Sequence, residues 1–482
     1  KATINPVISW SEMERQLSLL CDGLTEIYGY DHHICNDAMA ALAHVKYVQG
    51  DYKSAIDSIN AIITRVQKAG GEVENYRHDL AYYQYDSGDT AGAYENFEAG
   101  YNFNKNLILA NYRWMTLEER DAYTRTHRGN IDNIPHYAAL TPSDSRYAAL
   151  AYNALLFSKG LLLNSTIELS RLLQEAGDKE TLSMLDRWRS ANQKYRRAQD
   201  EEHPDAEKFK AQCEQLERRL MERSTVYGDY TAGLTVEYPQ VQQALGRNDV
   251  AVEFFSYRLD ARSLMYGALL LTADRAPIYV PVGIDSDWSG MMADCYKSPE
   301  LFNTIFAGLK QYLPRRDAGS IYFAADGVLH TLAIENMSGA EDYDFRRLSS
   351  TRELALADGG ADAVCRMAVY GGIKYGVGKL AEYYRTPGDG KRESGAFLAY
   401  LPETEVEADD IHSLLAGRIK VDRLTAEKAT ETSFKSLSGK RIDLLHVATH
   451  GFFEHPAVSS DISQFTGRAM ASSGLFFAGA QN

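Results

Sequence analysis

The run Asp443-Leu444-Leu445-His446-Val447-Ala448-Thr449-His450-Gly451 decides how the C-terminal part of this 482-residue chain folds. Its apolar residues predict a buried strand from Ile442 to Ala448, which ends at a histidine followed by a glycine. A histidine titrates near neutral pH, and a glycine lets its backbone N–H approach a reacting oxygen. Because a strand-terminal histidine is more often structural than catalytic, His450 and Gly451 need support from the rest of the sequence.

Strands and helices alternate in the residues before this run. The sequence predicts strands at 396–400, 419–424 and 442–448, separated by helices at 405–415 and 426–437. This alternation predicts a parallel sheet with right-handed crossovers, in which ligand sites gather at the carboxyl ends of the strands. His450 follows such an end.

Four segments resemble the CHAT family, caspase-like domains that occur joined to tetratricopeptide repeats. Residues 443–451 resemble the family's "LHxATHG" segment, and Ser473–Ala480 resembles "SGLxLAGA". Residues 321–330 resemble "PDGxLH", and residues 347–354 resemble "LSSTRxL". Together these segments extend over most of the C-terminal half of the chain.

The resemblance implies an α/β caspase-like domain with two halves. Residues 248–392 correspond to a non-catalytic half, and residues 393–482 to a catalytic half that is incomplete. In this comparison His450 is the base of a cysteine–histidine pair, and the Gly451 N–H stabilises the oxyanion. The reaction implied is peptide-bond hydrolysis through a thioester.

The nucleophile that the resemblance requires is missing. In the family the cysteine lies on the core strand that follows the histidine, so we expect it in a segment beyond residue 482 or in a second chain. The expectation is that the chain is truncated or that the polypeptide is cut between histidine and cysteine. All five cysteines precede His450, and each is predicted to be a buried or incidental thiol: Cys21, Cys35, Cys213, Cys295 and Cys365.

Three further titratable residues lie near the predicted strand ends. Glu403 and Glu405 follow the first predicted strand of the catalytic half, where caspase-like folds place part of the substrate pocket, and there they would select a basic side chain. The favoured reading is that they are acids at a helix N-terminus, which the helix dipole stabilises. His446 lies four residues before His450 on the same strand face and is predicted to pack or orient rather than to react.

Residues 1–142 predict an array of repeats of the tetratricopeptide type. A small residue, a Gly-Asp turn and an Ala-x-x-x-large pattern occur twice in the same register, with the turns at Gly50 and Gly88, 38 residues apart. Flanking helices at 11–28 and 107–127 are expected to complete the solenoid. Such arrays bind proteins, so we expect a protein substrate or activator as their partner.

Residues 143–247 predict a helical linker and a helical hairpin. A helix is expected at 145–177 after an irregular stretch at 129–142. The hairpin bends at His203-Pro204 and has a coiled-coil seam. One side of the seam is Phe209, Cys213, Leu216 and Leu220, and the other is Leu185, Trp188, Asn192 and Tyr195.

Composition excludes several classes of function. The formal net charge of −15 disfavours nucleic acid as a direct partner, and no apolar run is long enough to span a bilayer. Five scattered cysteines indicate a reducing compartment, for which the cytoplasm is the expectation. No cofactor motif occurs, and Asp31-His32-His33 with Cys35 lacks a second ligand pair, so no metal is expected.

The sequence therefore predicts a multidomain protein, an all-α solenoid and hairpin followed by an α/β caspase-like domain. Its predicted function is that of the histidine-bearing part of a cysteine endopeptidase regulated by protein binding. The polar segment 386–393, which contains Lys391-Arg392, is an ordinary loop or a site of autoprocessing. The alternative is a non-catalytic scaffold with a caspase-like docking module.

Overall fold

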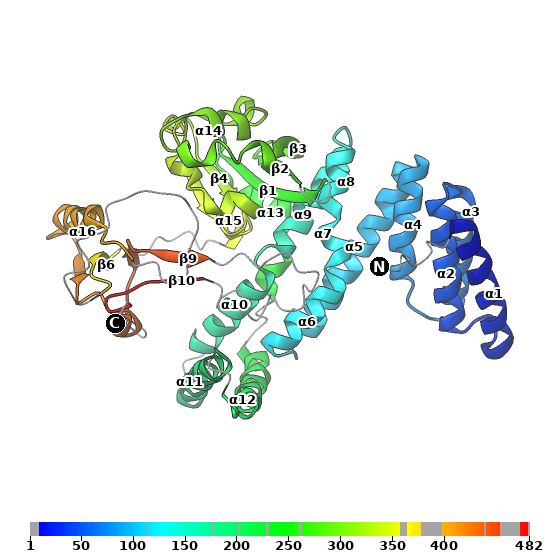
Figure 1. Cartoon of the computed structure of the whole chain (residues 1–482), viewed down its shortest axis with the longest axis horizontal. Coiled ribbons are helices and arrows are strands. Elements are labelled where there is room, and N and C mark those ends of the chain that lie inside the picture. The colour runs from blue at the N-terminus through cyan, green and yellow to red at the C-terminus, as the bar shows by residue number, and fades with distance from the viewer. Residues whose placement is uncertain are drawn as a thin grey trace, which may run out of the picture. The chain divides into compact units, whose positions relative to one another are not determined.

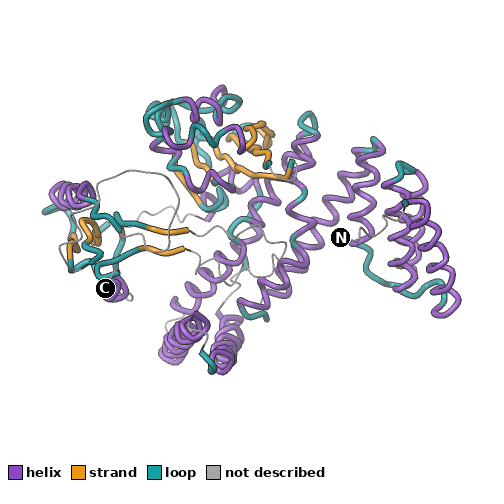
Figure 2. The backbone as a smooth tube through the Cα atoms, viewed as in Figure 1, coloured by secondary structure: helices purple, strands orange, loops and turns teal. Residues whose placement is uncertain are grey.

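The computed structural model describes residues 9–112, 114–175, 178–200, 203–227, 231–259, 263–356, 364–376, 398–437, 440–453 and 473–480 (Figure 1). The segment 386–393 lies outside these residues. The chain divides into two compact units, Lys1–Ala357 and Asp358–Asn482, and each is described by itself. Figure 2 shows that the first unit begins with helices only and ends with a sheet, whereas strands and helices mix in the second. None of the helices within the described ranges is long and apolar enough to cross a bilayer.

The first five helices pack against one another in chain order, and the two Gly-Asp turns lie where the sequence predicts them. Gly50 and Gly88 have φ of 86° and 95°, a region that favours glycine. The side chain of Asp51 then accepts a hydrogen bond from Ser54 N and starts the next helix. These hairpins are compatible with tetratricopeptide repeats. The helices are α1 (Trp10–Tyr28), α2 (His33–Val48), α3 (Tyr52–Lys68), α4 (Glu74–Ser87) and α5 (Thr90–Tyr112).

The next helices correct three predictions. The predicted helix 107–127 is divided, because α5 ends and a capping box of Thr116 and Glu119 starts a new helix. The stretch 129–142 holds two short helices rather than irregular chain. The predicted helix 145–177 breaks at Gly160, whose φ of 62° no α-helix has. The helices are α6 (Leu117–His127), α7 (Gly129–Asp132), α8 (Ile134–Leu140), α9 (Ser145–Ser158) and α10 (Leu161–Glu175).

The predicted hairpin consists of α11 (Lys179–Asp200) and α12 (Ala206–Tyr227). Leu185 and Leu220 are buried between them, 2% exposed each, and Trp188 packs against this cluster. The bend at His203-Pro204 is fixed in part by the His203 imidazole, whose Nδ1 accepts a hydrogen bond from Asp205 N. A 3₁₀ turn (Ala232–Thr235) and α13 (Tyr238–Ala244) lead on to the sheet.

The sheet of the first unit has the order β3-β2-β1-β4-β5. β1 pairs antiparallel with β2 and parallel with β4. Alternate residues of β1 face opposite sides: Ala251 and Phe255 pack on the helical array around α9, whereas Val252 and Phe254 pack on the other layer. The strands are β1 (Val250–Arg258), β2 (Leu264–Thr272), β3 (Arg275–Ile284), β4 (Ile321–Ala324) and β5 (Phe345–Leu348).

Residues 298–313 contain only a short helix. Only α14 (Glu300–Ile305) is α-helical, and a 3₁₀ turn follows at Lys310–Tyr312. Gly308 lies between them against β3, where a Cβ would be 3.3 Å from the Pro281 carbonyl oxygen.

A buried carboxylate joins the helical array to this sheet. Glu253 of β1 is 0% exposed, and its Oε2 lies 2.8 Å from Nζ of Lys159, the residue that ends α9. Its Oε1 accepts hydrogen bonds from the Thr351 N–H and hydroxyl at 2.6 and 2.7 Å. The neighbouring Arg352 is buried and donates back to the carbonyls of Leu156 and Lys159. The segment that resembles "LSSTRxL" thus links the helical array to the sheet.

The sheet of the second unit is parallel and has the order β7-β6-β8. One face of β6, with Met367 and Val369, packs on α16, and the other face, with Tyr370, packs on α17 and Phe477. A two-stranded antiparallel ladder follows β8. The elements are β6 (Arg366–Ile373), α16 (Pro402–Leu415), β7 (Lys420–Ala426), α17 (Glu431–Lys435), β8 (Leu444–Val447), β9 (Gly451–Phe453) and β10 (Ser473–Leu475).

The strand predicted at 396–400 is wrong for the residues described there, because Leu398 to Tyr400 form a loop. The strand that pairs with both β7 and β8 is β6. It lies in the predicted first half, 248–392, so the division between the two sheets precedes β6 rather than following residue 392. The Gly371-Gly372 pair interrupts the apolar run of β6, so the sequence pattern does not indicate a strand there. Gly371 is required because a Cβ at this position would lie 2.2 Å from the Thr404 carbonyl oxygen.

Replacing Lys159 with Met is expected to destabilise the first unit by about 3–5 kcal/mol, because the buried Glu253 carboxylate loses its cation. All four tryptophans lie before residue 358, so tryptophan fluorescence during urea unfolding reports on this unit alone. The matched control is Lys297→Met, at an exposed position, which is expected to change stability by less than about 0.5 kcal/mol. Equal midpoints for the two variants would contradict the role given to Glu253.

Candidate active site

The backbone that carries His450 is fixed by Tyr375, which lies just beyond the end of β6. The Tyr375 hydroxyl accepts the His450 backbone N–H at 3.3 Å and lies 2.9 Å from the Thr449 hydroxyl. Its ring contacts the imidazole, with ring centroids 5.1 Å apart. On the other side, Phe476 N donates to the His450 carbonyl at 2.9 Å. The imidazole therefore extends from a backbone that is hydrogen-bonded in both directions.

The imidazole of His450 has a backbone partner. Its Nε2 lies 2.7 Å from the carbonyl oxygen of Ala399, which only accepts hydrogen bonds. Nε2 must therefore carry the proton, and in the neutral imidazole Nδ1 is then the nitrogen that accepts a proton. This hydrogen bond fixes the tautomer and the orientation of the imidazole.

Gly451 is the first residue of β9 and lies opposite Leu475 of β10. Because Phe476 N donates to the carbonyl before Gly451, the Gly451–Leu475 pair is the non-hydrogen-bonded type of antiparallel pair. The Gly451 N–H therefore points away from β10. Its direction is compatible with the oxyanion donor that the sequence predicts, and no side chain at this position stands in the way.

β8 is an edge strand of the three-stranded sheet within the described residues. Leu444 and Leu445 point to opposite faces and are 45% and 47% exposed. An edge with exposed leucines on both faces is a surface on which a further strand can pair.

Cys365 cannot act with His450. It immediately precedes β6, and the register of β6 with β8 puts it level with Ile442. His450 lies eight residues further along the parallel direction, which is about 25 Å at the rise of a strand. The other four cysteines are buried. No cysteine of this chain is thus both accessible and at the carboxyl edge of the sheet.

Glu403 and Glu405 both lie in the first turn of α16. Glu405 accepts a hydrogen bond from the Tyr400 hydroxyl, and burial together with this carboxylate raises the pKa of Tyr400 to about 12. Their position is the one expected for acids that a helix N-terminus stabilises. They lie within six residues of Ala399 along the chain, and a role in selecting a basic substrate side chain stays a prediction.

His446 and His450 have different partners. His446 lies on the α16 face of β8, opposite Val369, with its Nε2 3.4 Å from Glu407 Oε1. His450 follows the end of the strand and binds a backbone carbonyl instead. His446 thus lies where the sequence predicts an orienting or packing residue, against a helix.

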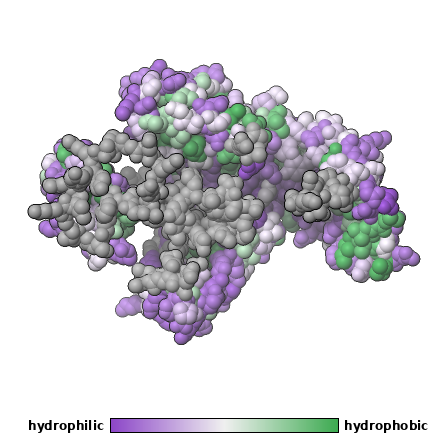
Figure 3. Space-filling view, viewed as in Figure 1, coloured by the Kyte–Doolittle hydropathy of each residue, from purple (hydrophilic) through white to green (hydrophobic). Residues whose placement is uncertain are grey.

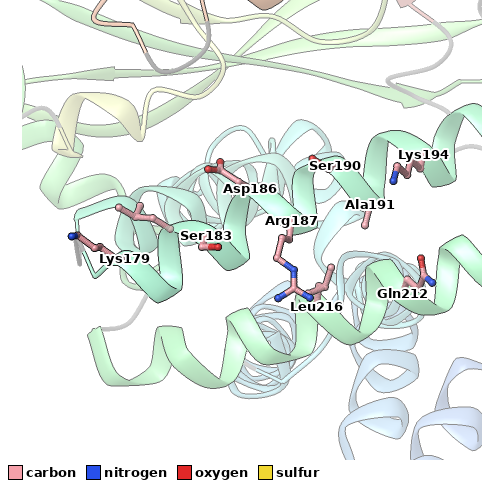
Figure 4. Close-up of a pocket in the computed structure, with 10 residues that line it drawn as sticks. Lys179, Ser183, Asp186, Arg187, Ser190, Ala191, Lys194, Gln212 and Leu216 are labelled. Carbon is pink, nitrogen blue, oxygen red and sulfur yellow. The ribbon is translucent and has the colours of Figure 1, made fainter.

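A groove and a histidine-containing segment lie elsewhere in the described part of the chain. Figure 4 shows a shallow groove between α11 and α12, built only by that hairpin and containing none of the predicted site residues. The segment 31–35 begins α2, where His32 caps the helix through Nδ1 and Cys35 Sγ contacts the Gly29 carbonyl. Among the described residues, no group of three or more His, Cys, Asp or Glu side chains is placed to hold a metal ion.

The sequence missed Tyr375 and Ala399. Tyr375 belongs to no motif, and its role depends on the pairing of β6 with β8. Ala399 acts through its carbonyl oxygen, which any residue would supply. Neither residue carries a signal in one sequence, because both act only through tertiary contacts.

Residues 297–482 match the family model of the CHAT domain. This match supports a caspase-like domain in the C-terminal part of the chain, and the helices before it are compatible with, without establishing, tetratricopeptide repeats. No curated protein matches the chain. The predicted roles of His450 and Gly451 stay predictions.

Replacing Tyr375 with Phe is expected to keep the ring contact and to lose the hydroxyl that accepts the His450 N–H. One lost hydrogen bond of about 1 kcal/mol predicts roughly fivefold faster exchange of the amides at 449–451, measured by hydrogen exchange and mass spectrometry. Tyr312→Phe, in the first unit, is the control and should leave this peptide unchanged. Unchanged exchange in Tyr375→Phe would show that Tyr375 does not stabilise the backbone at 449–451.

Proposed function

We propose that the CHAT domain provides the histidine base of a caspase-like cysteine endopeptidase. The observation that carries the proposal is the 2.7 Å contact of His450 Nε2 with the Ala399 carbonyl, at the carboxyl edge of a parallel sheet. A base needs this tautomer, because its second nitrogen must be free to receive a proton.

The proposed reaction follows from these positions. His450 Nδ1 takes the proton of a cysteine thiol, the thiolate attacks the peptide carbonyl, and the same nitrogen then protonates the departing amine. The Gly451 N–H stabilises the tetrahedral oxyanion, a contribution of about 3 kcal/mol for one donor. Water hydrolyses the thioester with His450 again acting as base.

We infer that the thiol arrives on a strand that pairs with β8. The exposed edge of β8 and its two leucines offer backbone partners and apolar contact on both faces of the sheet. A strand there, parallel to β8, would end beside His450. The segment beyond residue 482 or a second chain is the proposed source of this strand.

The helical array is proposed to recruit a protein substrate or activator, and binding is proposed to regulate cleavage. Apolar side chains gather at the right-hand end of the molecule in Figure 3, over α1. Helix α1 carries Leu19, Leu20 and Ile27, which are 58%, 49% and 73% exposed. An exposed patch of this kind is typical of a protein-binding surface.

Replacing His450 with Ala in the protein that includes the cysteine-bearing segment is expected to lower turnover of a quenched peptide library by about 10²–10⁴-fold. Residues 1–482 alone should cleave nothing, because the nucleophile is lacking. His446→Ala is the matched control, since it removes an imidazole from β8, four residues before His450, and it should retain most activity.

Cleavage by residues 1–482 after substitution of all five cysteines would refute the mechanism. Equal activity of the His450→Ala variant and the unchanged protein would favour the alternative of a non-catalytic scaffold.

Replacing Leu445 with Lys is expected to weaken binding of the cysteine-bearing strand at least tenfold, because a charge then faces the apolar contact at the sheet edge. Leu414→Lys is the control: it lies on α16, is 67% exposed and is not on the edge. Association is measured by size-exclusion chromatography with mass detection of the two separately expressed segments. Equal association of both variants would place the strand elsewhere.

A further inference from the structure

The helices α2 and α4 face each other through polar pairs with a constant offset. The Tyr76 hydroxyl donates to Asp37 at 2.9 Å, the Tyr83 hydroxyl lies 3.3 Å from His44 Nδ1, and the Tyr47 hydroxyl donates to Asp86. In all three pairs the residues are 39 positions apart. The pairs form the rungs of a ladder, which we call the α2–α4 ladder.

One rung of the ladder lacks its pair. The paired positions follow a spacing of seven and then three residues on each helix, and a helical face with that spacing has a further position at Ala40 on α2 and Asp79 on α4. Ala40 has no polar group to offer. Among the described residues, no hydrogen bond or ion pair reaches the Asp79 carboxylate, which lies half-buried between two satisfied rungs.

Burial raises the pKa of Asp79, with the nearby His44 acting in the opposite direction. The ionised carboxylate is therefore held at a cost in the folded protein, and a cation at this rung would lower that cost. None of the three ladder carboxylates, Asp37, Asp79 and Asp86, forms an ion pair with a lysine or arginine in the described part of the chain.

Aromatic rings pack into the core beside the unpaired rung. Tyr82 follows Asp79 by one turn, and its ring lies 5.4 Å from that of Tyr137 on α8 and 4.4 Å from His78. Burial lowers the pKa of His78 to about 4, so this imidazole is neutral at physiological pH and does not compete as a cation. Carboxylates without a cationic partner suit a guanidinium or ammonium group.

We infer that the α2–α4 ladder binds a basic, extended segment of a protein partner, with an arginine or lysine of that segment on Asp79. The inference rests on the proposed recruiting role of the array and names the chemistry of its partner. From the rung of Asp37 to that of Asp86 the helices rise about 15 Å, which about five residues of extended chain span. Alternate basic side chains can thus reach all three carboxylates. Phosphate-bearing partners are disfavoured by the same charges.

The test uses an alternating arginine–glycine heptapeptide with a fluorescent label, and its glutamate–glycine counterpart, in anisotropy titrations with the whole chain at physiological salt. The arginine peptide is expected to bind and the glutamate peptide not to bind. Asp79→Asn keeps the shape of the side chain and should raise the Kd about tenfold. Asp57→Asn is the matched control, an exposed aspartate on α3 outside the ladder, and should change the Kd less than twofold.

Three outcomes overturn the inference. The first is no binding of the arginine peptide to the unchanged protein. The second is an equal loss in Asp79→Asn and Asp57→Asn, which indicates general charge attraction. The third is a fall of several degrees in Tm for Asp79→Asn, since an unpaired carboxylate should not stabilise the fold. His450→Ala should bind the peptide normally, so failure of the proposed peptidase and failure of this site are separable.

Discussion

The buried carboxylate of Glu253 is the contact on which the first unit depends. It lies in the middle strand of a sheet, where an unpaired charge would cost several kcal/mol, and Lys159, Ser350 and Thr351 all turn towards it. Lys159 also ends α9, and Arg352 binds the last carbonyls of that helix. The end of one helix, the centre of one strand and one loop are therefore fixed by a single charge. Any change in the helical array that moves α9 must also move the sheet.

The proposed site in the second unit is held by backbone groups. Ala399 offers a carbonyl, Tyr375 binds a main-chain amide, and Phe476 closes the ladder behind His450. The imidazole and the Tyr375 hydroxyl are the side-chain groups in these contacts, and the others belong to the main chain. The geometry of the site therefore depends on β6, β8 and the start of α16 keeping their relative positions.

Sequence patterns predicted the elements that interactions between neighbouring residues determine. The Gly-Asp turns, the hairpin seam and β8 could be read because each depends on neighbours in sequence. β6 was missed because Gly371 and Gly372 interrupt an apolar run, and their reason is a helix more than thirty residues away, where Thr404 leaves no room for a side chain. The stretch that includes Leu398 is apolar because it packs against other residues, and its apolar character predicted a strand. Its backbone carbonyls accept hydrogen bonds from a side chain and not from a neighbouring strand. Tertiary contact decides both cases.

The constant offset of the α2–α4 ladder has a mechanical consequence for the array. In each rung a long tyrosine side chain is hydrogen-bonded to a shorter side chain on the other helix. These side chains therefore keep successive hairpins at a fixed distance. Three such pairs along one side of the helices hold the angle between hairpins, whereas apolar packing alone allows them to slide. The three hydrogen bonds thereby restrain α2 and α4 relative to each other from the polar face. A segment bound along that face would meet a surface whose geometry is already restrained.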